Sequence, residues 1–191
     1  MRIFFCIYLM LLTQACTPLD LLNHLVSKEG YRVEKNVFYG RESHQKLDLY
    51  LPETVTKDTP VVVFFYGGRW QGGRKEDYLF AAQGLVSLGY AVAVPDYRLY
   101  PQVKYPAFLE DSARAVAWVY RHIGEYGASG ENLYLVGHSA GAYNAVMVAL
   151  KPTYLKKAGG TTAWVRGVIR DVGRDTMSLK ERRVSRRTEK L

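Results

Sequence analysis

The chain has 191 residues, of which 48% are hydrophobic and 23% are charged. This length suits one domain with a sizeable hydrophobic core and is short for two domains. The formal net charge is +8, and half of that excess lies in the segment 170–191, which holds eight Lys and Arg residues against four Asp and Glu residues. The tail lacks interleaved aromatic residues, so the basic charge does not amount to a nucleic-acid-binding signature.

The N-terminal residues carry the pattern of an export signal. A positively charged N-terminus, with Arg2, is followed by an apolar run of about ten residues, which is too short to span a bilayer as a mature helix. We predict a signal peptide over 1–15. Residues 11–16 resemble a bacterial lipoprotein cleavage box, in which Cys16 would become the lipidated first residue of an exported, membrane-anchored protein. Ordinary cleavage with a periplasmic or secreted product, or an uncleaved anchor, is the alternative.

Both cysteines, Cys6 and Cys16, lie in this N-terminal region. The body of the chain therefore cannot build a disulfide framework or a cysteine-based metal cluster. We expect no metal and no cofactor. Residues 16–30 read as a tether that can include a short amphipathic helix ending at Gly30.

From residue 31 onward, strand patterns alternate with helix patterns. The run 60–66 is apolar without alternation, which is typical of a strand covered on both faces. Buried strands that alternate with helices predict an α/β domain over 31–169, with a mostly parallel sheet and helices on both faces. The expected strands are 31–39, 46–51, 60–66, 90–94, 132–136 and 163–169, and the expected helices are 75–88, 106–123 and 140–150. After Ile169 apolar residues become sparse, and we expect a basic, disordered tail over 170–191.

The strand 132–136 leads into the sequence Gly137-His138-Ser139-Ala140-Gly141, which is followed at once by a helix pattern. A Gly-x-Ser-x-Gly sequence between a strand and a helix is the context of a nucleophile elbow, with Ser139 as the nucleophile. Gly137 and Gly141 supply the room that so tight a turn requires. The Ala140 backbone N–H would lie where an acyl oxyanion forms.

A second glycine pair, Gly67-Gly68, ends the strand 60–66. Glycines here let backbone N–H groups turn toward a substrate, as a second oxyanion donor requires. Trp70 follows closely and is a candidate wall of the acyl pocket, although a packing role is equally compatible with the pattern.

Together these segments resemble the α/β-hydrolase family, in particular a bacterial carboxylesterase-like branch similar to arylformamidases and feruloyl-type esterases. The resemblance spans about residues 31–169 and rests on five segments in order: 46–52, 66–70, 95–99, 106–111 and 137–141. It implies a Ser139 nucleophile, an oxyanion hole that includes Gly67, Gly68 and Ala140, a small-molecule ester as substrate, and a structural role for Asp96.

The resemblance fails in one respect. The family's acid and histidine follow the nucleophile in the chain, but none of the four histidines, His24, His44, His122 and His138, follows Ser139. Asp171 and Asp175 lie in the predicted tail, with no expected strand to position them. No triad acid or histidine is therefore identified.

The predicted domain is shorter than the family's, because two further strand-helix units are expected after residue 169. The compositional change at Arg170 suggests a truncated gene or a change of reading frame, which would leave the strand 163–169 as an uncovered sheet edge. Two functional hypotheses follow. The first is a serine carboxylesterase that works through an acyl-enzyme on Ser139 and is weak without its base. The second is a non-catalytic pseudo-hydrolase or a defective gene product.

Overall fold

The computed structural model describes residues 22–27 and 29–171. The predicted signal peptide, the lipidation site at Cys16 and residues 172–191 of the predicted tail, with Asp175, lie outside the described residues. Among the residues that are described, no helix is long and apolar enough to cross a membrane.

One six-stranded sheet forms the centre of the domain, with strand order β1-β2-β4-β3-β5-β6. The first two strands run antiparallel to their neighbours, and β4, β3, β5 and β6 are mutually parallel. The strands are β1 (Tyr31–Phe38), β2 (Lys46–Pro52), β3 (Val61–Phe65), β4 (Ala91–Pro95), β5 (Leu133–His138) and β6 (Val165–Asp171). The predicted α/β class and the mostly parallel sheet are confirmed.

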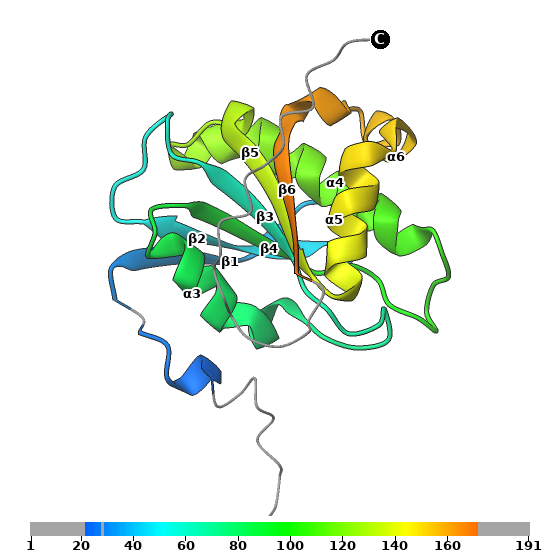
Figure 1. Ribbon diagram of the computed structural model, residues 1–191, viewed down its shortest axis with the longest axis horizontal. Coiled ribbons are helices and arrows are strands. Elements are labelled where there is room, and N and C mark those ends of the chain that lie inside the picture. Colours follow the sequence, from blue (N-terminus) through cyan, green and yellow to red (C-terminus); the bar gives the residue numbers. More distant parts are fainter. Residues whose placement is uncertain (1–21, 28, 172–191) are drawn as a thin grey trace, which may run out of the picture.

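Helices cover both faces of this sheet, as expected. Figure 1 shows α3 on one side and α4, α5 and α6 gathered on the other. The helices are α3 (Leu79–Val86), α4 (Ala107–His122), α5 (Ala140–Leu150) and α6 (Pro152–Lys157), with short 3-10 turns at 75–78, 123–126, 130–132 and 162–164. All residues of β3 and β4 are buried, because both faces of these strands are covered.

The predicted helix 75–88 divides into a 3-10 turn (Lys75–Tyr78) and α3. Asn23 explains the division. Its amide nitrogen donates to the carbonyls of Glu76 (3.0 Å) and Asp77 (3.1 Å), and its amide oxygen accepts from the Phe80 N–H (3.0 Å). Since an α-helix would join the Phe80 N–H to the Glu76 carbonyl directly, the Asn23 side chain takes the place of that bond. The predicted tether is therefore fixed to the domain at Asn23.

β6 begins and ends two residues later than predicted. Asp171 is its last residue, so the expectation that no strand positions Asp171 is wrong. Strand β6 pairs only with β5 among the described residues, and Ile169 is 56% exposed. The described sheet thus ends in an uncovered edge, as the sequence predicted.

Candidate active site

Ser139 occupies a strained turn between β5 and α5. Its φ is 51° and its ψ is −115°, a backbone conformation that side-chain-bearing residues rarely adopt and that costs about 1–3 kcal/mol. Backbone contacts hold the turn: the Ser139 N–H donates to the Asp171 carbonyl (2.7 Å), and the Ser139 carbonyl accepts from the Ala142 N–H (3.0 Å). The residue is exposed. This is the geometry expected of a nucleophile elbow.

The two elbow glycines stand where no side chain fits. A Cβ on Gly137 would lie 2.3 Å from the Gly141 carbonyl oxygen. A Cβ on Gly141 would lie 2.1 Å from the carbonyl oxygen of Phe65, at the end of β3. Because both obstacles are backbone atoms, neither could move aside easily. The tightness of the turn itself therefore requires Gly137, and the approach of α5 to β3 requires Gly141.

The loop after β3 approaches Ser139 directly. A Cβ on Gly67 would lie 3.1 Å from the Ser139 Cβ. Gly68 has a φ of 129°, and Arg69 and Trp70 also have positive φ, at 54° and 58°. Two consecutive residues with side chains in the left-handed region are strained, so the loop must be held in place by contacts elsewhere.

The predicted oxyanion donors differ in their availability. The Gly67 N–H donates to the Tyr78 hydroxyl oxygen (3.2 Å) and is thereby engaged. The Gly68 N–H has no hydrogen-bond partner among the described residues. Ala140 is the first residue of α5, where a backbone N–H has no partner within the helix and the positive end of the helix dipole lies. Of the three predicted donors, Gly68 and Ala140 are therefore the two whose N–H groups have no partner within the described part of the chain.

His138 is bound to the same tyrosine. Its Nδ1 lies 2.9 Å from the Tyr78 hydroxyl oxygen. The Tyr78 hydroxyl accepts from Gly67 with one lone pair and keeps one proton and a second lone pair for the contact with His138 Nδ1, whose direction follows the imidazole tautomer. Burial raises the pKa of Tyr78, so the hydroxyl keeps this proton at neutral pH. His138 therefore joins the elbow to the glycine loop through Tyr78. Sequence reasoning missed Tyr78, because nothing in the local pattern around residue 78 points to the elbow.

The other histidines lie elsewhere in the domain. His44, in the loop between β1 and β2, has Nε2 3.5 Å from an Asp111 carboxylate oxygen. His122 lies at the end of α4, where it pairs with Glu125 (2.7 Å). His24 belongs to the segment anchored near α3. Within the described residues, no histidine is hydrogen-bonded to the Ser139 hydroxyl.

Two aspartates near the C-terminal end of β4 have structural partners. Asp111 is fully buried, and both of its oxygens accept from the Arg98 guanidinium (2.7 and 2.9 Å). Asp96 accepts from the Lys75 backbone N–H (2.9 Å), and burial raises the pKa of its carboxyl. The structural role expected for Asp96 agrees with this contact.

Aromatic side chains line one side of the elbow. The Trp70 ring is stacked on Phe108, with centroids 5.2 Å apart and an interplanar angle of 23°. Tyr143, whose N–H bonds to the Ser139 carbonyl, meets Trp70 edge-on at 5.5 Å and 85°. The Trp70 indole N–H donates to Asn144 (2.9 Å). Tyr143 and Asn144 follow Ser139 by about one helical turn, a spacing that could have identified them as neighbours of the site.

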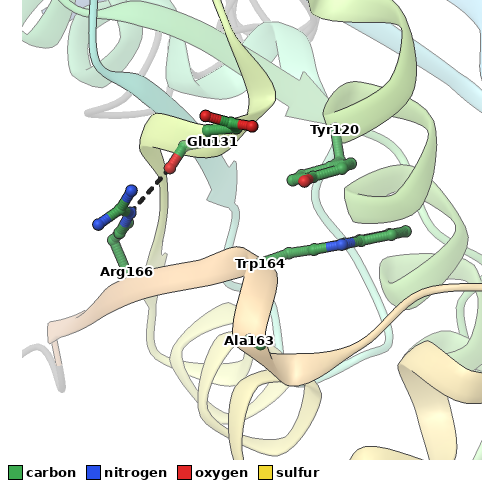
Figure 2. Close-up of a pocket in the computed structure, with 5 residues that line it drawn as sticks. All are labelled: Tyr120, Glu131, Ala163, Trp164 and Arg166. Atoms are coloured by element: carbon green, nitrogen blue, oxygen red, sulfur yellow. Dashed lines mark hydrogen bonds between the residues drawn. The ribbon is translucent and has the colours of Figure 1, made fainter.

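The structure also has a shallow pocket of about 250 Å³ near the N-terminal ends of β5 and β6, at the other end of these strands from the elbow. Figure 2 shows Trp164 and Tyr120 lying parallel within it, at a centroid distance of 3.9 Å, while Arg166 donates to the Glu131 carbonyl (2.8 Å). Glu131 precedes β5 and Ser139 follows it, so the length of the strand, roughly 20 Å, separates the pocket from the elbow. The pocket lining contains no nucleophilic hydroxyl other than that of Tyr120.

Comparison with known proteins places this geometry in a family. A family model described as BD-FAE matches residues 47–171. A probable isoprenylcysteine alpha-carbonyl methylesterase of Arabidopsis thaliana is 34% identical over 133 residues, which cover 69% of this chain and 28% of the relative. A kynurenine formamidase of Salmo salar is 38% identical over 116 residues, which cover 59% of this chain and 37% of the relative.

Solved structures show the same architecture. Inhibited esterase B from Lactobacillus rhamnosis superposes with a TM-score of 0.71 at 22% identity, covering 87% of this chain and 57% of that protein. At this identity the likeness shows the fold, which is that of α/β-hydrolases. The chain spans about a third of the length of the two sequence relatives named above. The match over 47–171, which covers the elbow and the glycine loop, shows that the chain belongs to the BD-FAE family of α/β-hydrolases.

Proposed function

We propose that this chain carries the nucleophile half of a serine carboxylic ester hydrolase. One observation carries the proposal: Ser139 is exposed on a strained turn next to the glycine loop, and the N–H groups of Gly68 in that loop and of Ala140 are free among the described residues. A hydroxyl in this position can attack an ester carbonyl, while the two N–H groups stabilise the resulting oxyanion. Loss of the alcohol would leave an acyl group on Ser139, and water would release it as a carboxylic acid.

The proposed reaction is slow in this polypeptide because no described histidine takes the Ser139 proton. Loss of the base in a serine triad lowers the rate by about 10⁴–10⁶-fold, and the oxyanion hole alone retains roughly 10³-fold over water. The hydroxyl proton must then pass to water. We therefore expect weak hydrolysis of activated esters and none of ordinary esters.

A second candidate is a non-catalytic hydrolase homologue that binds ligands at the elbow and the glycine loop. The engagement of His138 Nδ1 with Tyr78 favours it, because the histidine nearest to Ser139 in sequence is occupied at that nitrogen. In this case the glycine loop and the elbow remain as a binding surface without turnover.

A fluorophosphonate probe and a p-nitrophenyl short-chain ester together test the proposal on the purified chain. We expect slow covalent labelling that Ser139→Ala abolishes. Ser43→Ala, which changes an exposed loop serine, is the matched control and should label like the parent chain. Folded protein that neither labels nor hydrolyses the ester would refute the catalytic proposal and support the binding alternative.

We also propose that the chain is exported and anchored by a lipid on Cys16, because the N-terminal pattern supports this processing. Expression in a bacterium followed by membrane fractionation tests it. The parent chain should sediment with membranes, and Cys16→Ser should not be lipidated. Equal fractionation of the two proteins, with no lipid on the parent, would exclude lipid anchoring.

A further inference from the structure

The loop after β3 depends on a side chain from α5. Arg69 and Trp70 have positive φ, and the Trp70 carbonyl accepts from the Tyr100 N–H (2.7 Å). The Trp70 ring leaves the loop and packs between Phe108 and Tyr143. Its indole nitrogen reaches Asn144, which is fully buried on α5 five residues after Ser139. The strained loop is therefore joined to the helix that begins directly after Ser139.

The partners of Asn144 allow only one direction of hydrogen bonding. The Ser112 hydroxyl donates to the Phe108 carbonyl (2.8 Å), so toward Asn144 it can only accept. The Asn144 amide nitrogen donates to it at 3.2 Å. The amide oxygen consequently faces Trp70, whose indole N–H is a donor only. In the series of hydrogen bonds from Trp70 through Asn144 to Ser112, each contact has only one possible donor. The Asn144 amide is therefore held at both its oxygen and its nitrogen.

Packing alone does not require an asparagine at this place. The buried neighbours on α5 are apolar, among them Ala145 and Val148. An amide in such surroundings is tolerated only when its donor and acceptor are both satisfied. Here the acceptor is satisfied by the loop beside Ser139, and not by another core residue.

We propose that Asn144 is a positioning residue for the oxyanion hole. It holds Trp70, and through Trp70 it keeps the Gly68 N–H beside Ser139. Ala140, the other donor, begins the same helix, so one helix sets the spacing of both donors. This inference rests on the proposed function for its catalytic meaning, while the placement of Gly68 by Asn144 can be measured without catalysis.

The test compares variants of the full chain by ¹⁵N–¹H NMR. Asn144→Leu removes the acceptor at similar size, and Asn144→Asp keeps an acceptor for the indole. Val148→Ala is the matched control, a buried substitution of an apolar residue on the same helix. Trp70→Phe identifies the indole signal by its loss and keeps an aromatic ring on Phe108.

With Asn144→Leu we expect the Trp70 indole proton to exchange about tenfold faster, as loss of one hydrogen bond implies, and the Gly68 amide signal to shift. Asn144→Asp should restore most of the indole protection. Val148→Ala should leave the Gly68 amide signal in place. It should speed the exchange of the indole proton only as far as it lowers the stability of the whole domain. If Asn144→Leu does not fold, Trp70→Phe replaces it in the test. This variant removes the indole N–H that binds Asn144, so the Gly68 amide signal must shift.

A Gly68 amide that Asn144→Leu moves no more than Val148→Ala does would overturn the inference and leave Asn144 as a core residue. The inference also fails if Trp70→Phe leaves the Gly68 amide signal unchanged. Fluorophosphonate labelling separates this result from failure of the proposed function. If the parent chain does not label, catalysis is refuted while the NMR comparison still decides the role of Asn144.

Discussion

At the scale of single residues, close backbone contacts determine which positions tolerate change. Gly137, Gly67 and Gly141 each face atoms of a neighbouring segment at less than the normal contact distance of a Cβ. At Gly141 the neighbour is the backbone of β3, which is fixed within the sheet. The elbow is thus a rigid part of the core as well as the place of the proposed nucleophile.

We predict that Gly141→Ala lowers the free energy of unfolding by about 3 kcal/mol, because the new methyl group would overlap the Phe65 carbonyl. Gly84→Ala is the matched control. Gly84 is exposed within α3 and has no atom within 4 Å of the added Cβ, so the substitution should stabilise the protein by about 0.5–1 kcal/mol. Urea unfolding of both variants checks the pair, and equal effects would contradict it.

The Asp96 carboxyl gives a prediction on pH. Burial raises its pKa above that of the unfolded chain, so the folded protein binds more protons between the two pKa values. The free energy of unfolding contributed by this group therefore falls as the pH rises through that window. Asp96→Asn removes the titration and keeps an oxygen that can accept from Lys75.

Unfolding of the parent and of Asp96→Asn should be measured from about pH 4 to about pH 8. The parent should lose stability relative to the variant as the pH rises. A constant difference across this range would show that Asp96 does not titrate differently in the folded state.

At the scale of elements, contacts between distant segments position the site. Tyr78, at the entry to α3, binds both Gly67 and His138. Arg98 and Asp111 join the loop after β4 to α4. These contacts connect residues that no local pattern relates, and those of Tyr78 fix the glycine loop against the elbow.

Asn23 offers a test at this scale. Asn23→Ala removes three hydrogen bonds to the turn 76–80, and we expect a loss of about 1–3 kcal/mol together with faster amide exchange at Phe80. Asn132→Ala, which removes a single bond to the Asp58 carbonyl, is the control and should cost about 1 kcal/mol or less. Unchanged exchange at Phe80 would show that the segment 22–27 is not held by Asn23.

At the scale of the whole molecule, the described sheet has one protected and one unprotected edge. β1 protects its edge with the charged residues Arg32, Glu34 and Lys35, whereas β6 exposes Ile169 and, within the described range, pairs with β5 alone. An exposed edge strand of this kind promotes association between copies.

We predict that Ile169→Lys reduces self-association and changes the free energy of unfolding by less than about 0.5 kcal/mol. Leu150→Lys replaces an apolar residue that is 73% exposed at the end of α5, away from the strand edge, and is the control. Light scattering across a concentration series measures the effect. Equal improvement by both variants would assign the association to general hydrophobicity rather than to the edge.

The sequence by itself determined the order of the six strands and of α3, α4 and α5, the class of the fold and the position of the elbow, whereas the short helix α6 was not predicted. These follow from local signals, since apolar runs, helical spacing and Gly-x-Ser-x-Gly act through neighbours along the chain. Element ends were predicted less well, as at β6, because partner strands decide where a ladder stops.

Only the tertiary structure decided which groups beside Ser139 are engaged. The Gly67 N–H and His138 Nδ1 are bound by Tyr78, and Trp70 is held by Asn144. Hydrogen bonds between segments far apart in sequence depend on how the elements pack, and no periodicity records them. The sequence thus singled out Ser139, and packing determined that, of the three predicted donors, Gly67 is engaged while Gly68 and Ala140 have no partner among the described residues.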